Sequence, residues 1–419
     1  MQTNLSEAAQ TLERADEAES ILRACVHCGF CNATCPTYQL LGNELDGPRG
    51  RIYLIKQMLE GQPVTEKTQL HLDRCLSCRN CETTCPSGVR YHALLDIGRA
   101  EVERRTTRPA RERWLRAGLR HTVSRPAAFA ALLGAGRAAR ALVPGLLPAT
   151  LREKIPAKAP APGPRPAVRH ARRVLMLEGC VQPALTPNTN AAAARVLDRL
   201  GISVTPAPQA GCCGANDYHL NAQETGLARA RRNIDAWWPA IEAGAEAIVI
   251  SASGCGAFVK EYGDLLRNDA AYADKARRVS ALARDLVETI AAEPLDTFKA
   301  APASSTGRRI AFHCPCTLQH AQRLGGAVEG LLARLGFDLT NVANGHLCCG
   351  SAGTYSLTQP SIAQQLRDNK LDALEADRPD AIVTANVGCQ THLNSAGRTP
   401  VTHWIELLDT LLTPALEKL

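Results

Sequence analysis

The chain has 419 residues, of which 45% are hydrophobic and 21% charged, and its formal net charge is +7 at pH 7. This length allows two or three domains with separate cores. The 17 cysteines are an odd number grouped in metal-ligand spacings, which excludes a disulfide-rich secreted scaffold and favours a reducing cytosol. No apolar run reaches the roughly 18 residues of a membrane helix, and residues 1–24 lack the basic and apolar parts of a secretory signal.

Two copies of the motif C-x2-C-x2-C-x3-C-P lie within the first hundred residues, at Cys25–Pro36 and Cys75–Pro86. In two-cluster ferredoxins with this spacing, three thiolates of one motif bind one [4Fe–4S] cluster and the fourth binds the other cluster. Two zinc sites are the alternative, but they would explain neither the third cysteine of each motif nor the repeated Cys-Pro ending. We therefore assign four ligands to each cluster: Cys25, Cys28, Cys31 and Cys85 to the first, and Cys75, Cys78, Cys81 and Cys35 to the second.

Helices are predicted around both motifs. Residues 1–24 predict a polar helix, Gly47–Arg51 open a helix that ends at Gly61, and a short helix spans Glu66–Arg74. We therefore expect residues 1–100 to form a mostly α-helical two-cluster ferredoxin domain rather than the compact β-hairpin type.

Residues 101–170 are predicted to form a basic helical stretch followed by a Pro-rich linker. Eleven arginines and three glutamates lie between Arg99 and Arg140, interleaved with apolar residues such as Trp114 and Leu115. A solvated helical face explains this pattern, and the alternative is an amphipathic helix that docks on anionic lipid or an acidic partner. No nucleic-acid recognition motif accompanies the charge. The prediction is a cytoplasmic protein, with peripheral contact to the inner face of the cytoplasmic membrane as the alternative.

Five prolines between residues 156 and 166 cannot continue a helix or a central strand, which predicts a domain boundary near residue 168. Beyond it the chain repeats itself: Cys212-Cys213-Gly214 matches Cys348-Cys349-Gly350, and three further pairs of segments match at nearly the same offset. We expect a duplicated α/β domain, with copies at residues 171–293 and 308–419. Apolar runs alternate with amphipathic helices and predict small parallel sheets, with strands at 173–178, 202–205, 246–251, 309–313, 337–340 and 380–385.

A second set of cysteines follows these predicted strands, at the sheet edge where α/β proteins place functional residues. The first copy contributes Cys180, Cys212, Cys213 and Cys255, and the second contributes Cys316, Cys348, Cys349 and Cys389. These eight residues are candidate ligands of an additional iron–sulfur or zinc site. Buried, reduced thiols without a metal are the alternative.

The chain resembles a known family in these motifs. Its duplicated Cys-Cys-Gly domain is similar to that of heterodisulfide reductase subunits, and the fusion to a two-cluster ferredoxin domain resembles the iron–sulfur subunits of glycolate oxidase and anaerobic glycerol-3-phosphate dehydrogenase. The segments 27–38, 42–52 and 74–89 are most similar to the glycolate oxidase subunit. The family pattern ends each copy with C-x2-C, whereas Phe258 and His392 stand at the second position here. This departure argues against a double set of non-cubane clusters.

The resemblance implies an electron-transfer subunit that has no catalytic residue of its own. A dinucleotide motif is not evident, because Gly134 and Gly136 lack a third glycine and a preceding strand. Glycolate, or another 2-hydroxy acid, would then be oxidised on FAD in a partner subunit, with a membrane quinone or another acceptor downstream. Two alternatives stay open. The chain could be the iron–sulfur subunit of a D-lactate or glycerol-3-phosphate dehydrogenase with the same electron-transfer clusters, or a disulfide reductase like heterodisulfide reductase.

Overall fold

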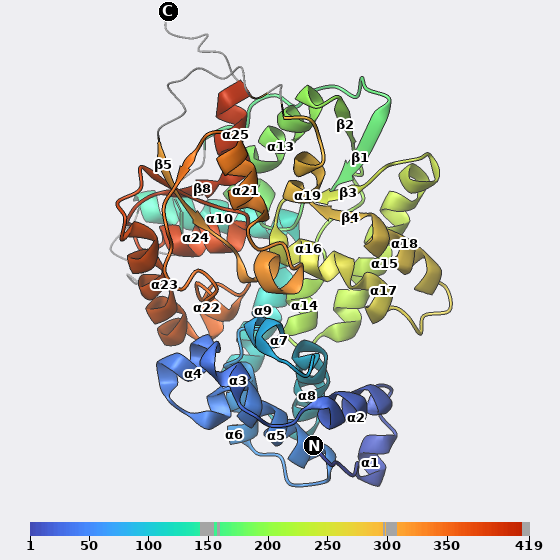
Figure 1. The fold of residues 1–419 in the computed structure, drawn as a ribbon. Helices are drawn as coiled ribbons and strands as arrows, with labels where there is room; N and C mark the ends of the chain where they lie inside the picture. The colour runs from blue at the N-terminus through green and yellow to red at the C-terminus, as the bar shows by residue number, and fades with distance from the viewer. Residues whose placement is uncertain (143–154, 157–159, 296–297, 299–307, 413–419) are drawn as a thin grey trace, which may run out of the picture. The chain divides into compact units, whose positions relative to one another are not determined.

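The computed structural model describes the chain except for residues 143–154, 157–159, 296–297, 299–307 and 413–419 (Figure 1). Contacts divide the chain into two units, which we call the ferredoxin unit and the sheet unit. The ferredoxin unit consists of Met1–Ala117 and His346–Leu366, and the sheet unit of Gly118–Gly345 and Arg367–Leu419. Part of the predicted Pro-rich linker lies outside the described residues, and the domain boundaries predicted from the sequence remain predictions.

The ferredoxin unit is built of short helices around the two cysteine motifs. Pro36 and Pro48 occupy the first turns of two of these helices, where a missing N–H costs no hydrogen bond. The predicted helix over residues 1–24 is wrong in one respect, because the chain turns after Gln10 and forms two helices. The elements up to residue 123 are α1 (Glu7–Gln10), α2 (Ala15–Ala24), α3 (Phe30–Ala33), α4 (Pro36–Leu41), η1 (Glu44–Asp46), α5 (Pro48–Leu59), α6 (Glu66–Asp73), α7 (Asn80–Thr84), α8 (Tyr91–Arg105) and α9 (Ala110–Val123).

The sheet unit contains two parallel four-stranded sheets with the same topology, in the orders β2-β1-β3-β4 and β6-β5-β7-β8 (Figure 1). The strands are β1 (Arg172–Met176), β2 (Ile202–Thr205), β3 (Ile248–Ile250), β4 (Ala283–Asp285), β5 (Arg309–His313), β6 (Asp338–Leu339), β7 (Ala381–Thr384) and β8 (Val401–His403). The prediction of a helical ferredoxin domain followed by a duplicated α/β domain with small parallel sheets is confirmed. The two edge strands β4 and β8 were not predicted, because each has only three residues and exposes the middle one.

Helices cover both sheets, and the two copies share one hydrophobic core. That core joins Val174 and Met176 of the first sheet to Ile310 and Phe312 of the second, with Trp404 fully buried among them. The remaining helices are α10 (Pro126–Leu142), α12 (Gln182–Leu185), α13 (Pro187–Arg199), α14 (Ala215–His219), α15 (Gln223–Glu242), α16 (Ser253–Lys260), α17 (Tyr262–Leu265), α18 (Ala273–Leu282), α19 (Leu286–Ala291), the π-helix η3 (Thr317–Ala321), α21 (Ala327–Arg334), α22 (Tyr355–Thr358), α23 (Pro360–Glu375), α24 (Val387–Asn394) and α25 (Trp404–Leu412).

In the described part of the chain, none of the helices combines the length and the apolar character that a crossing of the bilayer requires.

Candidate iron–sulfur centres

Both cysteine motifs fold into the same kind of loop. His27 and Gly29 in the first motif, and Ser77 and Arg79 at the equivalent positions of the second, have positive φ angles between 53° and 87°. These left-handed residues turn the chain between successive cysteines, so that their side chains can face one point. A short helix, α3 or α7, then carries the chain to the fourth cysteine. The two helices contact each other, and Thr34 Oγ1 and Thr84 Oγ1 lie 3.0 Å apart.

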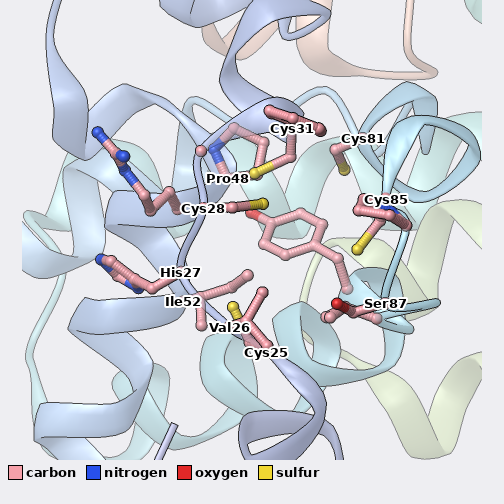
Figure 2. Close-up of a pocket in the computed structure, with 16 residues that line it drawn as sticks. Cys25, Val26, His27, Cys28, Cys31, Pro48, Ile52, Cys81, Cys85 and Ser87 are labelled. Atoms are coloured by element: carbon pink, nitrogen blue, oxygen red, sulfur yellow. The ribbon is translucent and has the colours of Figure 1, made fainter.

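The four cysteines assigned to the first cluster line one pocket (Figure 2). Cys25, Cys28 and Cys31 come from the first motif and Cys85 from the second, and Cys81 also lines the pocket. The thiols lie close enough for their charges to act on Cys31. The pKa of Cys31 is raised to about 11, first by burial and then by the negative charge of Cys25, Cys85 and Cys28. We refer to these four residues as the first set.

The four cysteines assigned to the second cluster also lie together. Burial raises the pKa of the Cys81 thiol well above its ordinary value, and the charges of Cys78, Cys75 and Cys35 raise it further. The fourth cysteine of the first motif thus lies among the first three of the second motif. We call Cys35, Cys75, Cys78 and Cys81 the second set.

The chemistry of both groups fits a [4Fe–4S] cluster. Four thiolates held this close together repel one another unless a cation lies among them, and an iron–sulfur core supplies that positive charge. The groups differ in exposure. All four cysteines of the second set are buried, whereas Cys28 of the first set is exposed and Cys31 and Cys85 are partly exposed.

This difference predicts an order of cluster loss. When the protein is treated with an iron chelator and a thiol-alkylating reagent, we expect the first set to be labelled before the second, because solvent reaches it more readily. Mass spectrometry of the labelled peptides would show Cys85 modified together with Cys25, and Cys35 protected together with Cys75. Labelling that follows the order of the motifs, with Cys35 modified early and Cys85 late, would contradict the crossed assignment.

The cysteines of the first copy of the duplicated domain are brought together within the sheet unit. Cys213 Sγ lies 3.4 Å from Cys255 Sγ. The pKa of Cys212 is lowered because the thiols of Cys180 and Cys213 donate hydrogen bonds to it. The predicted set Cys180, Cys212, Cys213 and Cys255 is therefore a compact group that can hold one thiolate without a metal.

Phe258 occupies the place where the family pattern has a further thiol. Its ring is buried and packs against Tyr218 and Tyr262, with ring centroids 5.4 and 5.9 Å apart. Tyr262 in turn donates a hydrogen bond of 2.5 Å to Cys213 O. This side of the cysteine group is therefore lined by aromatic rings, and Phe258 itself offers no ligand atom.

The cysteines of the second copy are divided between the units. Cys316 and Cys389 lie in the sheet unit, whereas Cys348 and Cys349 belong to the segment grouped with the ferredoxin unit. Beside Cys389 the structure places His313, a residue that we did not predict; a ring nitrogen of His313 and the Cys389 sulfur lie within 4.8 Å. The only sequence signal for it was the match of His313-Cys314-Pro315-Cys316 to the first strand of the other copy.

His313 is well suited to bind a metal. The pKa of His313 is lowered to about 3, first by burial and then by the charges of Lys370 and His392, so the imidazole is neutral at physiological pH. Its Nδ1 lies 2.9 Å from Thr384 Oγ1, and its buried Nε2 has no hydrogen-bond partner among the described residues. A neutral imidazole with one nitrogen oriented by a hydroxyl is typical of a metal ligand.

Comparison with known proteins gives matches along the chain. Residues 21–89 match a family model described as "4Fe-4S dicluster domain", and residues 174–260 and 310–394 each match "Cysteine-rich domain". The chain is 68% identical over 412 residues to "Glycolate oxidase iron-sulfur subunit" of Escherichia coli (strain K12), covering 98% of this chain and 99% of that protein.

More distant relatives match either nearly the whole chain or about half of it. "Probable glycolate oxidase iron-sulfur subunit" of Bacillus subtilis (strain 168) is 29% identical, with 97% of this chain and 96% of that protein covered. "Lactate utilization protein A" of Geobacillus thermodenitrificans (strain NG80-2) is 27% identical over 54% of this chain and 91% of that protein. With two cysteine motifs folded side by side, a duplicated cysteine-rich domain and 68% identity over nearly its whole length, the chain belongs to the family of glycolate oxidase iron–sulfur subunits.

Proposed function

We propose that this chain is the electron-transfer subunit of a glycolate oxidase complex. A partner subunit would oxidise glycolate to glyoxylate on FAD, and a membrane quinone or another acceptor would lie downstream. The observation that carries the proposal is the presence of two complete sets of four thiols side by side in one helical unit. A [4Fe–4S] cluster, when bound, takes up and releases one electron at a time. The chain's own residues hold and shield the two clusters and perform no acid–base chemistry.

The exposure of the thiols supports an order along the path. The first set opens to solvent at Cys28, where a partner protein can approach. The second set is buried. Arg74, the residue before Cys75, accepts a 2.9 Å hydrogen bond at its carbonyl oxygen from Tyr355, which follows the second Cys-Cys-Gly turn. The charges of both Cys75 and Cys348 act on Tyr355, whose pKa is raised mainly by burial. We infer that the first set exchanges electrons with a partner protein, and that the second set carries them further into the interior of this chain.

Substrate profiling of the purified complex tests the proposal. We expect the tagged chain to copurify with a flavin-containing subunit, and the complex to reduce a quinone analogue with glycolate as donor. D-Lactate or glycerol 3-phosphate as the preferred donor would support the alternative dehydrogenases. Activity towards a disulfide without a flavin subunit would favour the disulfide reductase.

We propose further that the duplicated domain binds a metal in its second copy, with His313 and Cys389 among the ligands. Iron, sulfide and zinc analysis of the anaerobically purified protein checks this. The ferredoxin clusters account for about eight irons per chain. About twelve irons would indicate a third cluster, and one zinc with about eight irons a zinc site. His313→Ala should then lose the additional metal and keep the eight irons. Eight irons without zinc in the wild type would contradict the proposal and leave buried thiols as the explanation.

The arginine-rich helix α9 supports a proposal of peripheral membrane contact. Trp114 is 78% exposed and Leu115 is exposed beside it, and α9 buries no residue. Apolar side chains among arginines favour insertion into the surface of an anionic bilayer. We expect Trp114→Ser to weaken cosedimentation with phosphatidylglycerol vesicles several-fold, while Val168→Ser, another exposed apolar position, leaves it unchanged. Equal binding by wild type and Trp114→Ser would contradict the contact.

A further inference from the structure

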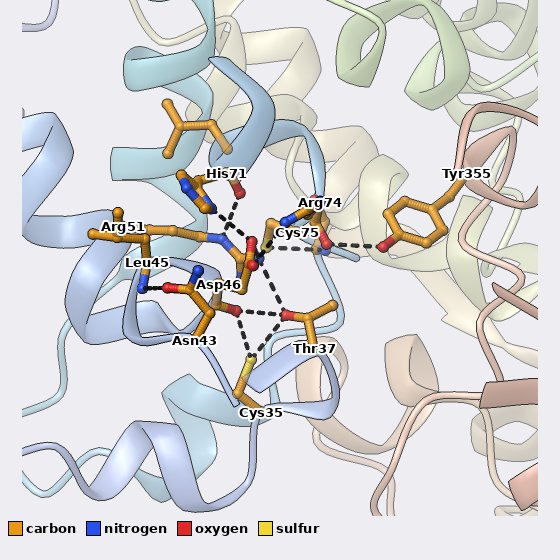
Figure 3. Close-up of polar contacts among 12 residues, drawn as sticks. Cys35, Thr37, Asn43, Leu45, Asp46, Arg51, His71, Arg74, Cys75 and Tyr355 are labelled. Carbon is orange, nitrogen blue, oxygen red and sulfur yellow. Dashed lines mark hydrogen bonds and ion pairs between the residues drawn. The ribbon is translucent and has the colours of Figure 1, made fainter. Parts of the chain in front are cut away.

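A buried arginine lies beside the second set of cysteines (Figure 3). Arg51, on α5, is 1% exposed and is among the largest fully buried side chains. Its Nε donates a hydrogen bond of 2.7 Å to His71 O, and its Nη2 donates one of 3.1 Å to Thr37 Oγ1. Both acceptors are uncharged, so these contacts hold the guanidinium in place without neutralising its charge.

The carboxylate closest to Arg51 is shared with other groups. Asp46 is fully buried, and its Oδ1 lies 3.7 Å from Arg51 Nη2, outside hydrogen-bond distance. The same oxygen lies 2.9 Å from His71 Nδ1, while Oδ2 accepts a 2.9 Å hydrogen bond from Arg74 Nη1. One negative carboxylate therefore lies near two positive guanidinium groups, those of Arg51 and Arg74. These three side chains together carry a net positive charge in this buried region.

The surplus charge acts on two cysteines of the second set. Burial by itself lowers the pKa of Arg51, but the pKa is raised overall because the charges of Cys75, Tyr91, Cys35 and Asp46 stabilise the cation. The interaction is mutual, so a positive Arg51 stabilises negative charge on Cys35 and Cys75. A cluster held by the second set would carry negative charge at both positions.

Thr37 contacts both the guanidinium and the Cys35 sulfur. Its Oγ1 accepts from Arg51 and lies 3.3 Å from Cys35 Sγ. The same hydroxyl donates a 2.7 Å hydrogen bond to Asp46 O, which fixes its position. Arg51, Thr37 and Cys35 thus form a continuous polar chain that ends at a predicted cluster ligand.

The glycine before Arg51 explains how α5 reaches this position. A Cβ atom on Gly50 would lie 2.2 Å from Glu44 O in the backbone of η1. Only glycine lets the first turn of α5 pack this closely against η1, the element that carries Asp46. The chain segment here is Gly47-Pro48-Arg49-Gly50-Arg51. It therefore places a buried cation directly after the glycine that the close packing of α5 against η1 requires.

The first set has no equivalent charge among the residues that line its pocket. Arg49 lines that pocket, but its side chain is one-third exposed and donates two hydrogen bonds, of 2.6 and 3.1 Å, to the carboxylate of Glu44. A paired and solvent-screened arginine exerts a much weaker field than a buried one. The two sets therefore differ in electrostatic environment although their loops are alike.

We propose that Arg51 raises the reduction potential of the cluster held by the second set. Reduction adds one electron, and thus one negative charge, to a group that its thiolates already make anionic, so a buried cation stabilises the reduced form more than the oxidised form. Asp46 acts in the opposite direction. The inference rests on the proposed function for the ligand assignment and for the electron source, the partner flavoprotein. Arg51 thus influences the reduction potential of this cluster through its electrostatic effect on the cysteine ligands.

Redox titration of the full-length protein with dithionite and mediators, followed by electron paramagnetic resonance, tests this inference without any substrate. Arg51→Gln should lower one of the two cluster potentials by at least about 59 mV, the shift that corresponds to a tenfold change in the equilibrium constant of a one-electron couple. Arg51→Lys keeps the positive charge, so the reduction potential in this variant should stay close to the wild-type value. Lys56→Gln removes a cation from the same helix, where it pairs with Glu60, and should change neither potential.

Asp46→Asn provides a test of opposite sign. Removal of this buried negative charge should raise the same reduction potential that Arg51→Gln lowers. A general disruption of packing at the site would instead shift the potential in the same direction in both variants. If Arg51→Gln loses its clusters, Asp46→Asn and Arg51→Lys decide the question. Unchanged potentials with intact clusters, or equal signs in Arg51→Gln and Asp46→Asn, would overturn the inference. A wild-type protein without two clusters would instead refute the proposed function.

Discussion

Replacing Cys28 by serine should abolish electron transfer from the complex to a quinone analogue while leaving reduction of the partner's flavin by glycolate intact. The variant removes one of the four thiolates of the first set, and the remaining three cannot hold a complete cubane cluster. Changes to residues that only support metal ligands already cost about 10- to 100-fold, so we expect the loss of a ligand to cost at least about 100-fold in turnover. Stopped-flow absorbance resolves the two steps.

Ser87→Ala is the matched control for this experiment. Ser87 lines the same pocket as Cys28 but carries no thiol, so the variant should keep both flavin reduction and quinone reduction. Equal loss of the two steps in Cys28→Ser would mean that the residue supports assembly of the complex rather than electron transfer.

Gly214→Ala should destabilise the duplicated domain by roughly 2–5 kcal/mol. Gly214 closes the first Cys-Cys-Gly turn with φ +102°, and a Cβ atom there would lie 2.4 Å from Gly226 O in the backbone of α15. The left-handed conformation costs about 1–2 kcal/mol for a residue with a side chain. The clash adds about 1–3 kcal/mol, because backbone on both sides must move. Chemical denaturation of the full chain measures the sum.

Gly244→Ala separates these two contributions. Gly244 also has a positive φ, +92°, but apart from its own atoms and those of its two chain neighbours no atom lies within 4 Å of the position where its Cβ would be. We therefore expect a loss of only about 1–2 kcal/mol. If the two variants lose equal stability, the close packing of the Cys-Cys-Gly turn against α15 contributes nothing, contrary to our account.

The features predicted from the sequence were those that local spacing determines. Three cysteines two residues apart form a loop of defined geometry, and the repeat of Cys212-Cys213-Gly214 at Cys348-Cys349-Gly350 indicated two copies of one fold. The strands predicted around residues 173–178 and 309–313 correspond to β1 and β5, because a buried parallel strand is a short apolar run wherever it occurs.

The features that were missed depend on tertiary contacts. Arg51 lies in the segment Gly47–Arg51 that predicted a helix, but nothing local distinguishes a buried arginine from a partly exposed one, such as Arg49 two residues earlier. His313 is the last residue of an ordinary strand, and its role as a candidate ligand follows only from its distance to Cys389, which is far away in sequence. The strands β4 and β8 are too short to produce a periodic pattern and depend on pairing with β3 and β7.

The most direct test of the central claim is the redox state of the clusters after anaerobic addition of glycolate to the purified complex. If this chain carries electrons away from a flavin partner, the electron paramagnetic resonance signals of reduced [4Fe–4S] clusters should appear after the flavin is reduced, and should disappear when a quinone analogue is added. Reduced flavin beside clusters that stay oxidised, with quinone reduction continuing at the full rate, would contradict the account.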